Sequence, residues 1–119
     1  MRPWKALLIA VAVLTSTAMV VSAQDSEEKV IPEFTEDYVA DAENLAGGKE
    51  VWESTCRGCH GASAYPGKAP KLRPARYEVE FVYDRVTYGF RKMPAWEDVL
   101  SEEERMSVSA YVVSRRFSP

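Results

Sequence analysis

This sequence of 119 residues has few of the side chains from which many binding and catalytic sites are built. It contains two cysteines and one histidine. A zinc site takes four ligands, so Cys and His alone cannot complete one here. The 15 Lys and Arg residues are outnumbered by 18 Asp and Glu residues, which gives a net charge of −3. Without a basic excess, nucleic acid is excluded as an expected partner on electrostatic grounds.

Strand patterns are also missing. No segment alternates apolar and polar residues for long enough to predict a sheet, and the chain has no internal repeat. Apolar residues at helical spacing instead predict three helices, at about 42–55, at about 78–88 and from Ser101 onward. The last of these begins with the capping box Ser101–Glu104. The length suits one domain, and we therefore expect a single all-α domain.

The first 23 residues have the pattern of an export signal. Arg2 and Lys5 give a positive start, residues 6–14 are apolar, and Val21-Ser22-Ala23 suits a signal peptidase. We expect cleavage after Ala23, a periplasmic location and no membrane span in the mature chain. Because the uncharged stretch 6–23 is borderline for crossing a bilayer, an uncleaved anchor is the alternative.

Residues 24–41 are predicted to form an acidic arm, followed by the domain proper at 42–119. From residue 24 to residue 53 there are ten acidic and two basic residues, whereas residues 57–119 hold eleven basic and eight acidic ones. The arm has few large apolar residues, so we expect it to be extended and to pack at most locally.

Both cysteines and the histidine fall within Cys56-Arg57-Gly58-Cys59-His60. The pattern Cys-x-x-Cys-His is the attachment sequence of c-type haem. Thiols one helical turn apart can each form a thioether with the same porphyrin edge, and His60 then offers its imidazole to the iron. A disulfide, a thioredoxin-like redox pair and zinc ligation are the alternatives for Cys56 and Cys59. The redox pair requires a βαβ setting that this chain lacks.

The iron needs a sixth ligand or has an open position, and because the chain has no second histidine, we consider its four methionines. Met1 and Met19 would leave with the signal. Met93 precedes Pro94, which disfavours helix and predicts an extended loop from which the thioether projects. Met106 falls inside the last predicted helix, where core packing is the expected role. We therefore predict His60 and Met93 as the axial ligands, a pair that raises the reduction potential.

Taken together, these features resemble a class I monohaem cytochrome c. The resemblance covers about residues 44–115 and keeps the order of the family's elements: Gly48–Trp52, the haem motif, residues 69–72, the Met93 loop and the last helix. It implies a small cytochrome c fold, with three to four helices packed round one covalently attached haem c. It also implies that the first and last helices cross, with Tyr111 facing Gly48.

The resemblance implies further neighbours of the haem. The carbonyl of Pro70 would accept a hydrogen bond from His60, although Ala69 stands where the family often has glycine. Trp96, Tyr65 and Arg76 are candidates for contact with the haem propionates. Two loops around the haem carry cations that could meet an acidic partner: Lys68, Lys71, Arg73, Arg76, Arg91 and Lys92.

Family members carry single electrons between larger redox proteins and have no catalytic residues. The resemblance therefore implies an electron-transfer protein, not an enzyme, that shuttles electrons between a donor dehydrogenase or reductase and a terminal acceptor. A haem subunit bound permanently to an oxidoreductase, such as a quinoprotein alcohol or sulfur-compound dehydrogenase, is one alternative. A gas binder or enzyme with an open sixth site and a thiol-disulfide oxidoreductase without haem are the others.

Overall fold

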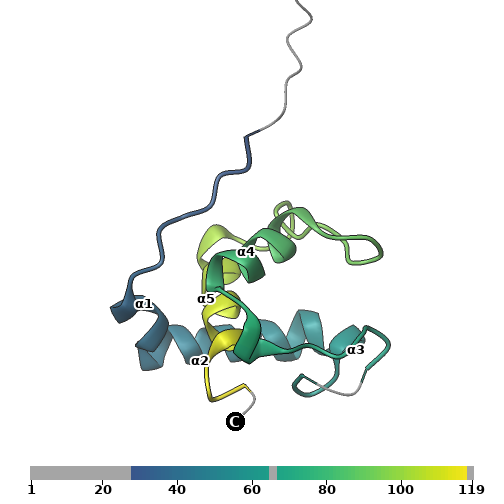
Figure 1. The fold of residues 1–119 in the computed structure, drawn as a ribbon, viewed down its shortest axis with the longest axis horizontal. Helices are drawn as coiled ribbons and strands as arrows, with labels where there is room; N and C mark the ends of the chain where they lie inside the picture. Colours follow the sequence, from purple (N-terminus) through teal and green to yellow (C-terminus); the bar gives the residue numbers. More distant parts are fainter. Residues whose placement is uncertain (1–27, 65–66, 118–119) are drawn as a thin grey trace, which may run out of the picture.

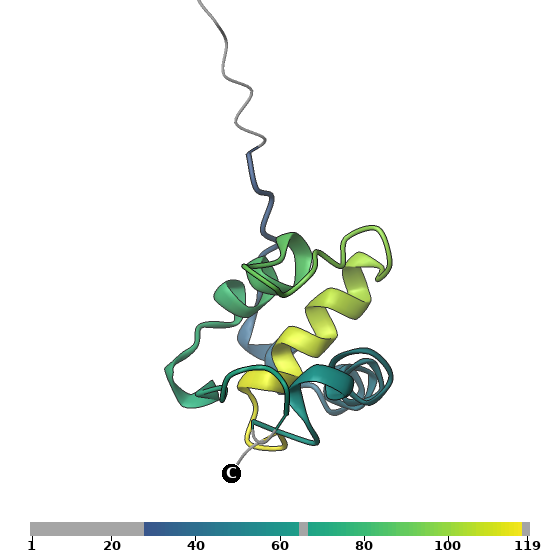
Figure 2. The same ribbon diagram turned by 90° about the vertical axis from the view of Figure 1, so that its right-hand side faces the viewer.

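A computed structural model describes residues 28–64 and 67–117, so the predicted signal peptide lies outside the described residues. Within these two ranges the regular structure is helical, and the only bridge of strand type joins Phe90 to Met93. Helix α5 (Glu102–Val113) contacts both α2 (Ala42–Val51) and α4 (Val79–Tyr88). It lies between them in both views (Figures 1 and 2). The predicted all-α architecture is confirmed.

The acidic arm is not wholly extended, contrary to our expectation for residues 24–41. Helix α1 (Glu36–Ala40) forms inside it, and the side chain of Thr35 caps its first turn by accepting a hydrogen bond from the Tyr38 amide at 3.1 Å. Asp41 ends α1 and caps α2, since its carboxylate accepts bonds from two amides of the next helix. Helix α1 contacts α2 and α5. The caps therefore define where the two helices begin, and the partly buried Tyr38 and Val39 pack α1 against the core.

The first predicted helix is confirmed and is longer than expected. Helix α2 continues through a π-helical turn, η1 (Trp52–Cys56), into α3 (Arg57–His60). The Ser54 hydroxyl donates to the Glu50 carbonyl at 2.9 Å within this stretch. Trp52 is only 2% exposed and belongs to the core. One unbroken helical segment thus carries the haem motif at its C-terminal end.

The predicted crossing of the first and last helices is confirmed at Gly48. A Cβ atom at this position would lie 2.1 Å from the Ser107 carbonyl oxygen and 2.7 Å from the Cβ of Tyr111. Only glycine lets the backbones of α2 and α5 approach this closely. At the start of α5, both bonds of the Ser101–Glu104 capping box are present. The core around the crossing includes Val108, which is fully buried.

Helix α4 is held by the last turn before α5 on one side and by the N-terminal segment on the other. The Trp96 amide donates to the Val86 carbonyl at 3.0 Å. On the outer side the Lys29 ammonium lies 3.0 Å from Asp84, and the Tyr88 hydroxyl bonds both the amide and the carbonyl of Val30. The start of the described chain therefore packs against α4.

Candidate haem site

The haem motif lies on the last turn of the first helical segment. Cys56 ends η1 and is buried, whereas Cys59 is exposed on α3. Both are free thiols, so the disulfide alternative does not describe this structure. Burial, together with the nearby Cys59, raises the pKa of the Cys56 thiol to about 11. Before haem attachment this shift would keep the Cys56 thiol protonated, whereas a thiol oxidoreductase needs an activated thiolate.

The imidazole of His60 is half-buried at the end of α3. Burial lowers its pKa, which keeps the ring neutral, and the neutral ring is the form that binds a metal. Its Nδ1 atom is buried and has no hydrogen-bond partner among the described residues. A histidine that ligates a metal normally engages its second nitrogen in a hydrogen bond, so this unpaired nitrogen marks where such an acceptor belongs.

Pro70 lies close to this helix end in the chain, but it is exposed and no hydrogen bond from His60 to it is described. The neighbouring Ala69 amide donates to the Cys59 carbonyl at 2.8 Å, which ties this loop to the haem motif. The hydrogen bond between His60 and Pro70 therefore stays a prediction.

Two residues that the sequence did not single out for the site hold the backbone around His60. The indole nitrogen of Trp52 donates to the Gly61 carbonyl at 3.1 Å, and its ring centroid lies 5.6 Å from that of His60. A Cβ at Gly67 would lie 2.3 Å from the Cys59 carbonyl oxygen. The loop therefore closes on α3 at a position that only glycine can occupy. Its place among the prolines of this loop was the only sequence signal for Gly67.

Met93 lies in a tight turn that follows α4. Phe90 and Met93 exchange two backbone hydrogen bonds of 3.0 Å each. Gly89 has a φ of 74° and Arg91 a φ of 56°, so the turn uses the left-handed region twice. The loop position predicted for Met93 is confirmed, and its half-buried side chain packs against the core. Met106 is half-buried on α5 and is not part of the core cluster.

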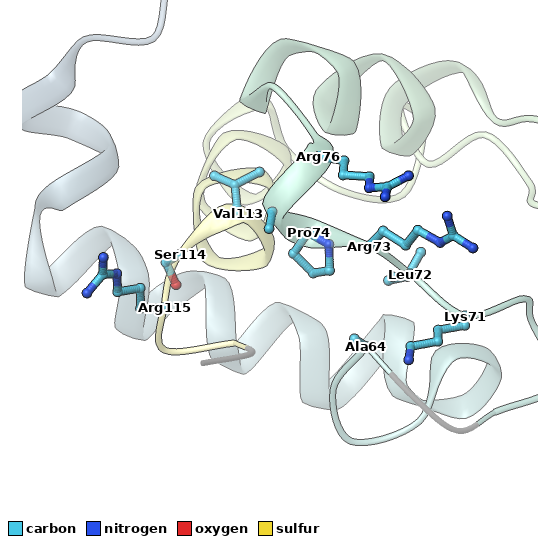
Figure 3. A pocket seen from close by; sticks show the side chains of 10 residues that line it. Ala64, Lys71, Leu72, Arg73, Pro74, Arg76, Val113, Ser114 and Arg115 are labelled. Carbon is cyan, nitrogen blue, oxygen red and sulfur yellow. The ribbon is translucent and has the colours of Figure 1, made fainter.

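The Met93 turn and α3 lie on the same side of the molecule (Figure 1). A wide, open hollow of about 730 Å³ lies between residues 71–76 and the end of α5. Its walls are apolar at Leu72 and Val113 and basic at Lys71, Arg73, Arg76 and Arg115. Arg73 and Arg76 point in the same direction (Figure 3). Cys56, Cys59, His60 and Met93 do not line this hollow, so it is not the predicted haem site.

The described residues do not support the zinc alternative. No group of three His, Cys, Asp or Glu side chains within residues 28–64 and 67–117 is placed to hold a metal ion.

The sequence model of the family described as cytochrome C oxidase, cbb3-type, subunit III matches residues 43–112. The chain belongs to this family. It is a class I monohaem c-type cytochrome and has one covalently attached haem c.

Individual proteins to which this cytochrome is similar are also c-type cytochromes. Over 82 residues it is 35% identical to the chloroplastic cytochrome c6 of Chlamydomonas reinhardtii, an alignment that covers 61% of this chain and 55% of that protein. It is 36% identical to cytochrome c6 of Cladophora glomerata, over 60% of this chain and 89% of that one. The solved structure of the c-type cytochrome SorU from Sinorhizobium meliloti is 33% identical, with a TM-score of 0.53, over 61% of this chain and 91% of that chain.

The residues of the cytochrome fit the haem. The thiols are spaced one helical turn apart, and the neutral imidazole follows the second of them. The Nδ1 of that imidazole has no partner among the described residues, so it could donate to an acceptor while the other nitrogen binds iron. Among the described residues, no helix combines the length and the apolar character of a membrane span.

Proposed function

We propose that this cytochrome is a periplasmic one-electron carrier. The haem supplies a reversible Fe(III)/Fe(II) couple. The observation that carries the proposal is the placement of a half-buried, neutral His60 at the end of a Cys-x-x-Cys helix, with Met93 in a turn on the same side of the fold.

Each site residue has a separate part in this proposal. Cys56 and Cys59 would hold the haem through two thioethers, and His60 and Met93 would be the iron ligands. A histidine and a thioether together would leave no open position for small gases, which favours electron transfer, and would raise the potential. The carbonyl of Pro70 would complete the unpaired Nδ1 of His60 and fix the orientation of the ring.

The basic residues near the site would serve charge recognition. Arg73 and Arg76 extend in one direction from the 61–76 loop, where guanidinium groups could pair with the haem carboxylates or with a partner protein. No carboxylate interrupts residues 61–77, which contain four cations. Docking of the carrier would then be brief and would weaken as salt is added.

Location and partners are part of the same proposal. The export pattern of residues 1–23 supports a periplasmic protein, with a donor dehydrogenase or reductase on one side and a terminal acceptor on the other.

A second candidate is a haem subunit held permanently by an oxidoreductase. The name of the matching family, which is that of an oxidase subunit, favours it. Purification at native expression levels distinguishes the two: a free carrier elutes as a monomer, whereas a subunit co-purifies with a catalytic chain in fixed ratio.

The visible spectrum tests the ligand assignment. We expect a c-type α-band in the reduced protein and a weak far-red band in the oxidised protein. Met93→Ala should abolish the far-red band and lower the potential, because the thioether sulfur stabilises Fe(II). Met106→Ala is the matched control and should keep both. If Met106→Ala removes the band and Met93→Ala does not, the assignment of the sixth ligand is wrong.

A further inference from the structure

An exposed cluster of aromatic and arginine side chains covers the outer face of α4 and continues onto the Met93 turn. Phe81 is 44% exposed and Phe90 is 47% exposed. The Arg85 guanidinium lies between them, 4.8 Å from the ring centroid of Phe81 and 4.2 Å from that of Phe90. Arg91 stacks over Phe90 at 5.1 Å. These four residues are called the aromatic–arginine patch below.

Neighbouring groups hold the patch in place without covering it. The Tyr77 ring lies 5.4 Å from the Phe81 ring, and Asp84 lies 3.6 Å from the Arg85 guanidinium. The two backbone hydrogen bonds between Phe90 and Met93 fix the turn. Because side chains that are already ordered lose little entropy when a partner binds, this surface is prepared for docking.

The composition of the patch is that of an interface centre. Aromatic residues and arginine are enriched in protein interfaces, and a few such residues supply most of the binding free energy. Two large exposed phenylalanines so close together are costly on a surface that contacts only water.

The charge around the patch indicates the chemistry of the partner. Residues 89–95 contain Arg91 and Lys92 and no carboxylate. Asp84, the carboxylate beside Arg85, also forms an ion pair with the Lys29 ammonium at 3.0 Å. Glu78 and Glu80 precede Phe81 closely in the sequence, so the positive charge is concentrated at the end of the patch next to the turn. There Arg85 and Arg91 contact Phe90, and Lys92 follows, so this end complements an acidic surface with an apolar middle.

We propose that the aromatic–arginine patch is the surface on which an acidic redox protein docks. This inference rests on the proposed electron-transfer function and names the docking face for it. Phe90 and Met93 belong to the same turn, so a partner seated on the patch lies next to the proposed sixth ligand. Phe81 and Phe90 would enter the apolar area of the partner, while Arg85 and Arg91 would face its carboxylates.

Electron transfer to two probes tests the proposal. The reduced holo-cytochrome gives one electron either to the Cu(II) of an acidic plastocyanin, which becomes Cu(I), or to ferricyanide, which becomes ferrocyanide. The small ferricyanide anion needs no apolar docking surface. In the double variant Phe81→Ser, Phe90→Ser, we expect the second-order rate with plastocyanin to fall about tenfold, while the ferricyanide rate and the visible spectrum stay unchanged. Val99→Ser, which changes a 67% exposed residue outside the patch, should leave both rates unchanged.

Two results would overturn the proposal. One is a double variant that reduces plastocyanin at the wild-type rate. The other is a double variant whose electron-transfer rate with ferricyanide falls as much as its rate with plastocyanin, or whose visible spectrum changes. Either change would mean that the phenylalanines shield the haem itself. Arg91→Gln should reduce the salt dependence of the plastocyanin rate, and an unchanged dependence contradicts the assigned role of the charge. A wild-type protein that cannot reduce ferricyanide contradicts the proposed function, which is a different result from any of these.

Discussion

Replacing Gly48 by alanine should open the crossing of α2 and α5. The added Cβ would lie 2.1 Å from the Ser107 carbonyl oxygen, which is 1.3 Å less than the 3.4 Å of an ordinary contact. The Ser107 carbonyl carbon at 2.6 Å and the Tyr111 Cβ at 2.7 Å also obstruct it. Since two of these atoms are backbone, rotation of a side chain cannot relieve the clash, and the helices must separate.

The magnitude follows from two opposing effects. Overpacking a core typically costs about 1–3 kcal/mol, and separation of a whole helix pair belongs at the upper end. Alanine regains about 1 kcal/mol of intrinsic helix propensity over glycine. We therefore expect Gly48→Ala to lower the free energy of unfolding by about 1–2 kcal/mol net. In a domain of this size each kcal/mol corresponds to about 4–8 °C in Tm.

Gly47→Ala is the matched control on the same helix. A Cβ at Gly47 meets no atom within 4 Å, so only the propensity gain remains. This variant should raise the free energy of unfolding by up to about 1 kcal/mol. Denaturant unfolding of both holo-proteins, followed by far-UV circular dichroism, measures the difference. If Gly48→Ala is as stable as the wild type or as Gly47→Ala, the close approach of the helices is refuted.

Two further substitutions test the frame around the site. Gly67→Ala should lower Tm, because its Cβ would lie 2.3 Å from the Cys59 carbonyl oxygen. Gly58→Ala is the control and should not lower Tm, because its Cβ meets nothing within 4 Å. Equal melting temperatures for the two variants would contradict the loop packing. Arg105→Ala should cost about 1–3 kcal/mol in denaturant unfolding, because its guanidinium donates to the Glu97 and Leu100 carbonyls that connect the Met93 loop to α5. Arg116→Ala, which loses one exposed hydrogen bond of 3.5 Å, is the control. If Arg105→Ala lowers the free energy of unfolding by no more than Arg116→Ala does, the bonds of Arg105 do not stabilise the loop.

The helices that pack against the core were predictable because local pattern and tertiary role agree in them. Helix α4 has apolar residues at helical spacing and ends at Gly89, and α5 begins at a capping box. The close contact at Gly48 was predictable from spacing as well as from resemblance, because Gly48 shares the apolar face of the helix with Leu45 and Val51, whereas Gly47 does not.

Features that depend on contacts between distant residues were not predictable. The hydrogen bonds between Val30 and Tyr88 join positions 58 residues apart, so no local pattern reveals that the N-terminal segment packs on α4. Helix α1 has no fully buried residue, and its only apolar contacts with the core come from the partly buried Tyr38 and Val39, too short a pattern to predict a helix.

In the site, the sequence indicated the chemistry but not the supporting contacts. The spacing of Cys56, Cys59 and His60 indicates haem on its own. It does not show that one thiol is buried and the other exposed, or that the Trp52 indole donates to the Gly61 carbonyl. Pro94 predicted an extended loop at Met93. The tight turn found there was not predicted, because it needs a left-handed Arg91 and arginine rarely adopts that conformation.

The central claim is that a haem is attached to this chain through Cys56 and Cys59. Extraction of the correctly matured protein with acidified acetone, followed by mass spectrometry of its peptides, tests it most directly. The account predicts that the pigment stays with the protein and that the peptide containing residues 56–60 carries the mass of one haem. Pigment that leaves in the acetone, with that peptide at its unmodified mass, would contradict it.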